Sequence, residues 1–380
     1  MKLSLNTTQI ENWLPLGEKP LLISGPCSAE TEEQLLITAK ELAEIRKVHL
    51  FRAGIWKPRT RPNTFEGVGE KGLRWLQSVK EETGLLVTTE VANAKHVELC
   101  LKYGIDVLWL GARTSVNPFS VQEIADALRG TSIPVMIKNP ISPDLNLWIG
   151  ALERINKAGI TKIAAIHRGF SSMERTPFRN VPMWEIPIEL KTIFPSLPII
   201  CDPSHIAGSR KLIPMISQKA IDLDMNGLMI ESHFHPKSAL SDSEQQLTPT
   251  QLSSILEELI IRDSNITNKK FKDEIEQLRN AIDEIDEEVI QNLSLRMDIA
   301  ERIGEFKKKN KITILQANRW EEIVNQRLKT GLALSLSEEF IRGFLKLIHS
   351  ESIRKQSIVM NSKLLKRKIK KNRSTLLRYK

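Results

Sequence analysis

The sequence has few cysteines and no long apolar segment. Its 380 residues include only Cys27, Cys100 and Cys201, which lie far apart and are odd in number, so they do not form a disulfide framework. No stretch approaches the roughly 20 consecutive apolar residues that a membrane span needs. The N-terminal sequence MKLSLNTTQIENW lacks the apolar core and the small-residue cleavage site of a signal peptide. We therefore expect a cytoplasmic protein without a membrane segment.

Acidic residues are absent from the last twenty positions. The segment NSKLLKRKIKKNRSTLLRYK carries nine Lys or Arg residues, and subtracting these from the net charge of +9 leaves residues 1–360 formally neutral. Runs of like charge are typical of solvated segments, so we predict a disordered basic tail over residues 361–380. Contact of this tail with nucleic acid or another polyanion is the less favoured alternative, because the charge does not belong to a folded surface.

Eight short apolar runs lie between residues 20 and 235, spaced 22–36 residues apart and separated by helical stretches. They are LLIS (21–24), HLFRA (49–53), LLVTT (85–89), VLWL (107–110), IPVMI (133–137), KIAAI (162–166), LPII (197–200) and GLMI (227–230). Such runs are typical of buried strands, and eight β–α repeats predict an α/β fold, a (β/α)8 TIM barrel over residues 1–262. No GxGxxG or P-loop motif directly follows the first apolar run, which argues against an open doubly wound sheet.

The spacing of apolar residues in the remaining chain predicts helices. At 380 residues the chain is too long for one ordinary core, and from about residue 271 the apolar residues recur at alternating three- and four-residue steps. This predicts one long amphipathic helix, followed by helices near 317–330 and 337–359. We assign residues 263–270 to a linker and 271–360 to an all-α domain. Three helices of unequal length make a poor globule, so we expect a homodimer or a higher homo-oligomer.

A polar cluster follows each predicted strand, where (β/α)8 enzymes place their chemistry. One group, Cys27, His205, Glu231 and Asp242, has the thiolate, imidazole and carboxylate ligands of a divalent metal such as Mn, Fe, Co or Zn. The other group is cationic and indicates two anionic ligands, since guanidinium groups suit phosphate and carboxylate oxygens. It comprises Arg52, Lys57, Arg59, Arg113, Lys138 and Arg168. The alternatives are core packing for Cys27 and surface salt bridges for the cations.

Six motifs within the first 260 positions contain strand-end residues named above: GPCS, FRAGIWKPRTRPNTFEGVGEKGL, GARTSVNPF, IHRGF, CDPSHIAG and ESHFHPKSALSDSEQQLTP. In these the chain resembles the type Iβ 3-deoxy-D-arabino-heptulosonate 7-phosphate (DAHP) synthases, with KPRT as the most specific element. The resemblance implies condensation of phosphoenolpyruvate with D-erythrose 4-phosphate, releasing phosphate.

The resemblance also implies a role for each residue at the strand ends. Cys27, His205, Glu231 and Asp242 would bind the metal, and Arg59 with Thr60 would bind the sugar phosphate. Phosphoenolpyruvate would be held by Arg52, Lys57, Arg113, Lys138 and Arg168. Glu90 would lie near the attacking water, and Lys57 is a candidate proton donor to the forming hydroxyl. His233 and His235 are interpreted as loop residues.

From about Leu278 to Gln356 the chain resembles the chorismate mutases of the all-α class. The matching residues are Arg279, Arg296, Lys307, Arg319, Ser352 and Gln356. At about 100° per residue, Arg296 and Lys307 share a helix face, whereas Arg279 is turned by about 260° and does not easily share their pocket. In the family it reaches into the partner chain's site. The resemblance implies that arginines clamp the two carboxylates of chorismate, with Lys307 and Gln356 at the ether oxygen.

Two positions depart from this resemblance. Many relatives have Arg-Glu where this chain has Arg319-Trp320, and Gln316 stands where Asp is common. The contact to the substrate hydroxyl is therefore unassigned. Two hypotheses follow: a bifunctional shikimate-pathway enzyme that also converts chorismate to prephenate, or a monofunctional DAHP synthase whose helical domain is a dimerising allosteric sensor of chorismate or prephenate.

Overall fold

The computed structural model describes residues 4–13, 20–57, 64–262 and 269–376. The chain divides into two compact units, Met1–Ser264 and Asn265–Lys380, and each is considered by itself. Within the described ranges, no helix is long and apolar enough to cross a membrane.

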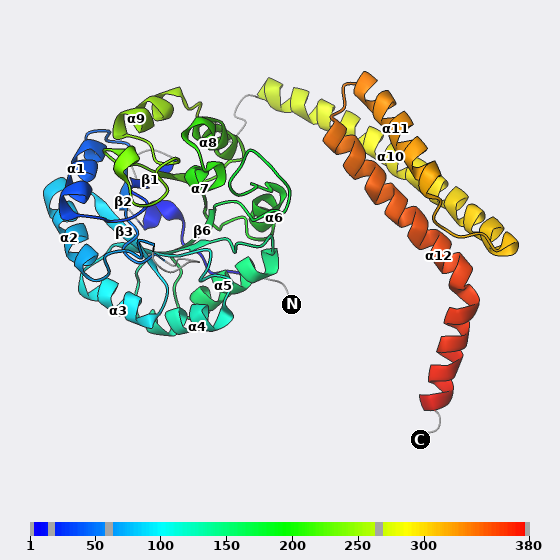
Figure 1. Cartoon of the computed structure of the whole chain (residues 1–380), viewed down its shortest axis with the longest axis horizontal. Coiled ribbons are helices and arrows are strands. Elements are labelled where there is room, and N and C mark those ends of the chain that lie inside the picture. The colour runs from blue at the N-terminus through cyan, green and yellow to red at the C-terminus, as the bar shows by residue number, and fades with distance from the viewer. Residues whose placement is uncertain (1–3, 14–19, 58–63, 263–268, 377–380) are drawn as a thin grey trace. The chain divides into compact units, whose positions relative to one another are not determined.

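Eight parallel strands close the first unit into a barrel in chain order, from β1 to β8 (Figure 1). They are β1 (Leu21–Gly25), β2 (Leu50–Arg52), β3 (Leu86–Val91), β4 (Val107–Leu110), β5 (Val135–Lys138), β6 (Ile163–His167), β7 (Ile199–Cys201) and β8 (Gly227–Glu231). The barrel closes where β1 pairs with β8, from Leu21 opposite Gly227 to Gly25 opposite Glu231. The predicted (β/α)8 fold is confirmed.

Helices surround the strands as an outer ring (Figure 1). They are α1 (Glu32–Ala43), α2 (Lys71–Thr83), α3 (Ala94–Lys102), α4 (Pro118–Ala127), α5 (Leu145–Lys157), α6 (Glu185–Ile193), α7 (Pro203–Ala207), α8 (Ile213–Asp222) and α9 (Pro249–Glu258), with short 3-10 turns η1 (Ile10–Asn12), η2 (Arg210–Leu212) and η3 (Pro236–Ser238). Several begin at a side chain that accepts a hydrogen bond from a free backbone N–H of the first turn, as Thr31 does for α1 and Asp144 for α5.

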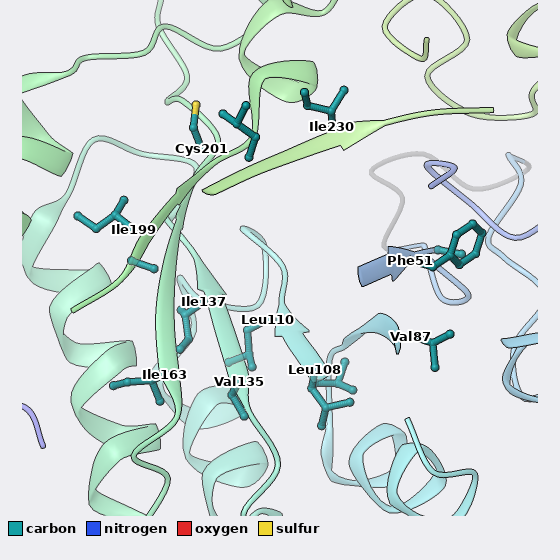
Figure 2. Close-up of a cluster of buried hydrophobic side chains, with 14 of the residues drawn as sticks. Phe51, Val87, Leu108, Leu110, Val135, Ile137, Ile163, Ile199, Cys201 and Ile230 are labelled. Carbon is teal, nitrogen blue, oxygen red and sulfur yellow. The ribbon is translucent and has the colours of Figure 1, made fainter. Parts of the chain in front are cut away.

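The pleat of each strand sorts its side chains into two cores. Outward residues pack between strands and helices; Figure 2 shows several of them, including Phe51, Leu108, Leu110 and Ile137. Inward residues, such as Trp109 of β4, fill the barrel interior. The inner cluster also takes in Ile10 and Trp13 from the η1 region, which is tied to the start of β6 by a Thr8–Thr161 hydrogen bond. Because these residues cover the N-terminal end, the opposite rim is left for a site.

Three helices make the second unit: α10 (Lys269–Asn310), α11 (Ala317–Ala333) and α12 (Glu338–Leu376). Helix α12 packs against both others. A β-carbon on Gly304 of α10 would lie 3.0 Å from the Cα of Gln356, so the glycine permits close approach of α10 and α12.

Helix α12 continues to Leu376, through most of the basic segment for which the sequence analysis predicted disorder. No Pro or Gly follows Gly343, and the segment is rich in Lys, Arg and Leu. These residues have high helix propensity. The disorder of residues 361–380 stays a prediction.

Candidate active site

The last inward position of four strands carries an ionisable side chain. Along β2, Leu50 points inward and Phe51 outward, so the next residue, Arg52, points inward. The same alternation turns Glu90, Lys138 and Glu231 inward at the ends of β3, β5 and β8. These groups therefore meet at the C-terminal rim, above the apolar layer that contains Trp109.

Three of the four predicted metal ligands lie together. Cys27, Glu231 and Asp242 each offer a ligand atom, and these atoms lie within 4.8 Å of one another. Cys27 Sγ is 3.1 Å from Asp242 Oδ2. Asp242 has a φ of 52°, a left-handed conformation that Asp tolerates better than most residues.

His205 completes the group from the start of α7. Its Nε2 lies 3.8 Å from Glu231 Oε1, while its Nδ1 is 2.9 Å from Asp202 Oδ2. Asp202 therefore orients the imidazole so that Nε2 faces the other candidate ligands, an arrangement common for metal-binding histidines.

The charges around this group support cation binding. Burial and the charge of Glu231 raise the pKa of the Cys27 thiol to about 12. Burial alone would also raise the pKa of Glu231, but His205 and Arg52 hold it below its usual value, so the carboxylate is ionised. The two carboxylates repel each other at this spacing, and a divalent cation would relieve this repulsion and displace the thiol proton of Cys27. The donor set thus fits a divalent transition metal.

A cavity of about 110 Å³ opens beside these ligands. It is lined by Lys57, Glu90, Ala112, Arg113, Lys138, Arg168, Arg179, His205 and Asp242. Five of the nine lining residues are Lys or Arg, and the cavity therefore favours anionic ligands. Most of the cationic residues predicted from the sequence are brought together here, whereas Arg59 and Thr60 lie outside the described residues.

Two buried arginines at the rim are only partly satisfied, Arg168 in its charge and Arg52 in its hydrogen bonding. Burial, together with the charges of Arg179 and Arg113, lowers the pKa of Arg168 to about 10 despite nearby Asp202. Arg52 is 1% exposed and lies 3.2 Å from Glu231 Oε1, with its guanidinium carbon 5.0 Å from the centre of the Trp109 ring. Its Nε and Nη1 have no hydrogen-bond partner among the described residues. An anionic ligand would satisfy such groups.

Lys57 contacts a candidate ligand directly, and Lys138 contacts the carboxylate that orients another. Lys57 Nζ donates to Cys27 Sγ at 2.9 Å and to the Cys27 carbonyl at 3.1 Å. Lys138 Nζ lies 2.8 Å from Asp202 Oδ2. Burial would raise the pKa of Asp202, but His205 and Lys138 hold it well below its usual range. Asp202 therefore stays ionised and positions two of the predicted site residues.

Glu90 lines the same cavity and accepts a hydrogen bond from Trp109 Nε1 at 3.1 Å. The backbone of Gly111, after β4, lies against its carboxylate. The side chain is thus held from two sides.

The sequence analysis missed Arg179. It lies in the loop after β6, donates to Asp242 Oδ1 at 2.9 Å and to Gln245 Oε1 at 2.7 Å, and lines the cavity. In the sequence, Arg179 is recognisable only as one more arginine in a loop after a strand. It lies eleven residues beyond Arg168, too far from the end of the strand to be selected as a strand-end residue. His233 and His235, interpreted as loop residues, interact with each other through a His235 N–H to His233 Nδ1 bond of 2.9 Å.

In the helical unit, the predicted residues fall into two sets. Arg296 Nη1 donates to Ser352 Oγ at 2.6 Å, and Lys307 Nζ donates to the Ile314 carbonyl at 2.6 Å. Gln356 is buried, and its Oε1 has no partner among the described residues. These residues belong to the facing helices α10 and α12.

The other two arginines are exposed and form pairs within their own helices. Arg279 Nη1 lies 3.5 Å from Glu276 on α10, and Arg319 Nη1 lies 3.0 Å from Glu322 on α11. Trp320, the departure noted in the sequence, stacks on His349.

Family models match both units. The model described as the DAHP synthetase I family matches residues 12–268. The chain belongs to this family. The model described as chorismate mutase type II matches residues 278–357. A DAHP synthase domain and a chorismate mutase domain, a transferase and an isomerase of aromatic amino acid biosynthesis, are thus joined in one chain, as the resemblances predicted.

Two relatives and one solved structure are similar to about two thirds of this chain. A phospho-2-dehydro-3-deoxyheptonate aldolase of Thermotoga maritima is 33% identical over 238 residues, covering 63% of this chain and 68% of the relative. A 2-dehydro-3-deoxyphosphooctonate aldolase of Variovorax paradoxus is 28% identical over 287 residues, covering 69% and 96%. The crystal structure of the Thermotoga maritima aldolase, described as a DAHP synthase, matches with a TM-score of 0.57 at 32% identity, covering 63% of this chain and 67% of that one.

Proposed function

We propose that residues 1–262 condense phosphoenolpyruvate with erythrose 4-phosphate to DAHP and phosphate, and that residues 271–360 rearrange chorismate to prephenate. The observation that supports the first activity is the cavity in which five cations meet the Cys27, His205, Glu231 and Asp242 group. Two phosphorylated substrates require this much positive charge, and an aldehyde electrophile benefits from the neighbouring metal ligands.

Cys27, His205, Glu231 and Asp242 would hold a divalent ion, Mn, Fe, Co or Zn. When bound, such an ion supplies Lewis acidity that makes the aldehyde of erythrose 4-phosphate electrophilic. Asp202 keeps the His205 ring oriented through its 2.9 Å contact with Nδ1. Gln245 Nε2 donates to Glu231 Oε2 at 2.7 Å and fixes that carboxylate in the same way.

The cations would bind and orient phosphoenolpyruvate. Lys57, Arg113, Lys138 and Arg168 line the cavity and suit its carboxylate and phosphate, and buried Arg52 would assist them. Arg59 and Thr60 would bind the sugar phosphate. C3 of phosphoenolpyruvate forms the new bond to the aldehyde carbon, water adds at C2, and phosphate leaves. Fixed cations stabilise charge at C2, while Glu90 orients the water and Lys57 protonates the forming hydroxyl.

Replacement of Cys27 tests the metal assignment. We expect Cys27→Ala to lose bound divalent metal, measured by elemental analysis of the purified protein, and to lose synthase activity. Cys100→Ala is the matched control, because Cys100 is also buried but lies within α3 in the outer core. Unchanged metal content and synthase rate in Cys27→Ala would contradict the assignment.

The mutase proposal is supported by Arg296, Lys307 and Gln356. Arg296 and Lys307 are suited to the carboxylates of the substrate, and the amide N–H of Gln356 can donate to an ether oxygen; the rearrangement needs orientation and charge stabilisation but no proton transfer. Separate assays of the intact chain test this. If no prephenate forms while prephenate still inhibits the synthase, the helical unit is a sensor and not a mutase.

We also propose that the helical unit forms a homodimer or a higher homo-oligomer. Leu278, Ile282, Ile285 and Val289 lie along one stripe of α10 and are between 42% and 66% exposed. A stripe of this kind needs a partner helix. Packing of this stripe against a helix of a second chain would also bring Arg279 close to that chain. Sedimentation of Ile285→Glu, expected to shift toward monomer relative to Glu284→Gln, tests this.

The cytoplasm is the proposed location. Cys27, Cys100 and Cys201 are all buried and free, as is usual in a reducing compartment.

A further inference from the structure

Trp320 of α11 and His349 of α12 form a stacked pair, with ring centres 3.9 Å apart and planes inclined by 22°. Both side chains are partly buried. None of the mutase roles proposed above uses either residue. A stack of this kind fixes the orientation of the imidazole and therefore the direction in which its nitrogens point.

His349 lies on the helix face that carries the mutase residues. His349, Ser352 and Gln356 follow one another at three- and four-residue spacing, which places them on one side of α12. Ser352 on that side accepts a hydrogen bond from Arg296 of α10. Burial lowers the pKa of His349, and the charges of Arg296 and Lys307 lower it further, so both cations lie within electrostatic reach of the ring. His349 therefore lies beside the proposed substrate pocket of these residues.

Acceptors are few in this pocket: besides His349, Gln356 Oε1 is an acceptor without a partner among the described residues. Arg296 and Lys307 can only donate. The Ser352 hydroxyl is already engaged, since it accepts from Arg296 and donates to the Ile348 carbonyl at 2.8 Å. His349 makes no hydrogen bond within the described part of the chain through either ring nitrogen. A neutral imidazole offers one acceptor nitrogen, and the ring hydroxyl of chorismate is a donor that needs one.

We propose that His349, held in place by Trp320, accepts a hydrogen bond from the ring hydroxyl of the substrate. His349 is thereby a substrate-contacting residue, and Trp320 is a positioning residue. The proposal rests on the mutase function proposed above. It involves no bond breaking and no net proton transfer. The groups that face the imidazole are Arg296 and Lys307 on α10 and the uncharged Trp320 on α11.

A pair of ligands tests the contact. Both are compact bicyclic ether dicarboxylates that mimic the rearranging ring, one with the ring hydroxyl and one without it. Calorimetry on the full-length protein should show that His349→Leu weakens binding of the hydroxylated ligand roughly tenfold, as expected for one lost hydrogen bond, while the deoxy ligand binds unchanged. His349→Gln retains an acceptor and should recover most of the loss. Ser350→Ala, at the exposed neighbouring position, is the matched control.

The pH profile separates a direct contact from a structural role. Protonation removes the acceptor, so the affinity ratio of the hydroxylated to the deoxy ligand should fall in the wild type as the pH drops below 6.5, the usual pKa from which that of His349 is lowered. The ratio should not change in His349→Gln. Trp320→Ala should reduce the ratio at every pH, whereas Trp320→Phe, which keeps a stacking ring, should not.

Each outcome has one meaning. If His349→Leu weakens both ligands equally, or neither, the assignment of His349 is wrong even where the wild type forms prephenate. If the wild type binds the ligands but forms no prephenate, the ligand ratio still decides the His349 contact. If the wild type neither binds them nor forms prephenate, the mutase function itself fails and the His349 proposal fails with it.

Discussion

Gly111→Ala should displace Glu90, whose carboxylate provides the three atoms nearest to the added β-carbon. An added β-carbon at Gly111 would lie 2.7 Å from Glu90 Cδ, and still closer to Oε1. Carbon atoms reach favourable contact only at about 3.5 Å, so the carboxylate must move by roughly 1 Å. Gly111 does not have a positive φ, so alanine introduces no backbone strain of its own.

A shift of this size predicts a large loss of synthase activity. Misplacing a reacting or orienting group by about 1 Å can cost on the order of 100-fold in rate, so we expect kcat/KM for DAHP formation to fall by roughly that factor. The hydrogen bond from Trp109 Nε1 to Glu90, now 3.1 Å, would lengthen, and the loss of this partly buried bond should cost about 1–3 kcal/mol of stability. A coupled phosphate-release assay and thermal unfolding measure the two effects.

Gly150→Ala in α5 is the matched control. A β-carbon there meets nothing within 4 Å, and alanine in a helix interior is favoured over glycine by about 0.5–1 kcal/mol. The control should therefore keep full synthase activity and unfold slightly later. Prephenate formation should be unchanged in both variants. If Gly111→Ala retained kcat/KM within a factor of about three, the position of Glu90 would not matter to the reaction and its proposed role would be refuted.

Three further perturbations have defined outcomes. Asp202→Asn keeps the α7 cap but leaves Lys138 charged and unpaired in the core, so the barrel should lose about 3–5 kcal/mol in denaturant unfolding, and a loss under about 1 kcal/mol would contradict this. His49 Nδ1 accepts from Leu22 N–H at 3.0 Å, and burial lowers the His49 pKa from 6.5. The unfolded chain therefore binds that proton first, stability should decline as the pH falls below about 6.5, and unfolding curves should show a smaller decline in His49→Gln. Deletion of residues 361–380 should leave both activities unchanged, and a loss of either would give the tail a role.

The barrel and most of its rim could be predicted from two regularities of the sequence: the eightfold β–α repeat and the polar cluster that follows each apolar run. Alternation along a strand fixes which side chains turn inward, as at Phe51 and Arg52 of β2. Parallel closure then brings every strand end to one rim, so Lys138 and Glu231 could be assigned to a common site before any contact was known.

What escaped prediction depends on loop geometry and on partners distant in sequence. Arg179 contacts Asp242, 63 residues away, and no strand or helix period connects them. The orienting role of Asp202 required knowing that the His205 ring turns back toward it within one short helix. Trp320 was noticed as a departure, but its stacking on His349 depends on how α11 packs against α12. The sequence indicates which side chains reach the rim, whereas the conformations of the loops determine which of them contact one another.

The rim combines two opposite charge imbalances in one buried place. Glu231 and Asp242 place two carboxylates beside the Cys27 sulfur, with the three ligand atoms within 4.8 Å of one another, while the pKa of Arg168 is lowered to about 10 by burial and by neighbouring arginines. A ligand of opposite sign would relieve each imbalance: a divalent cation for the first and, on the proposed function, phosphoenolpyruvate for the second. Each ligand should therefore stabilise the barrel on its own, by about 2.7 kcal/mol at a concentration 100 times its Kd. Because the cation also reduces the negative field felt by the anion, thermal shifts with both ligands should exceed the sum of the separate shifts, and a smaller combined shift would mean that the two halves compete.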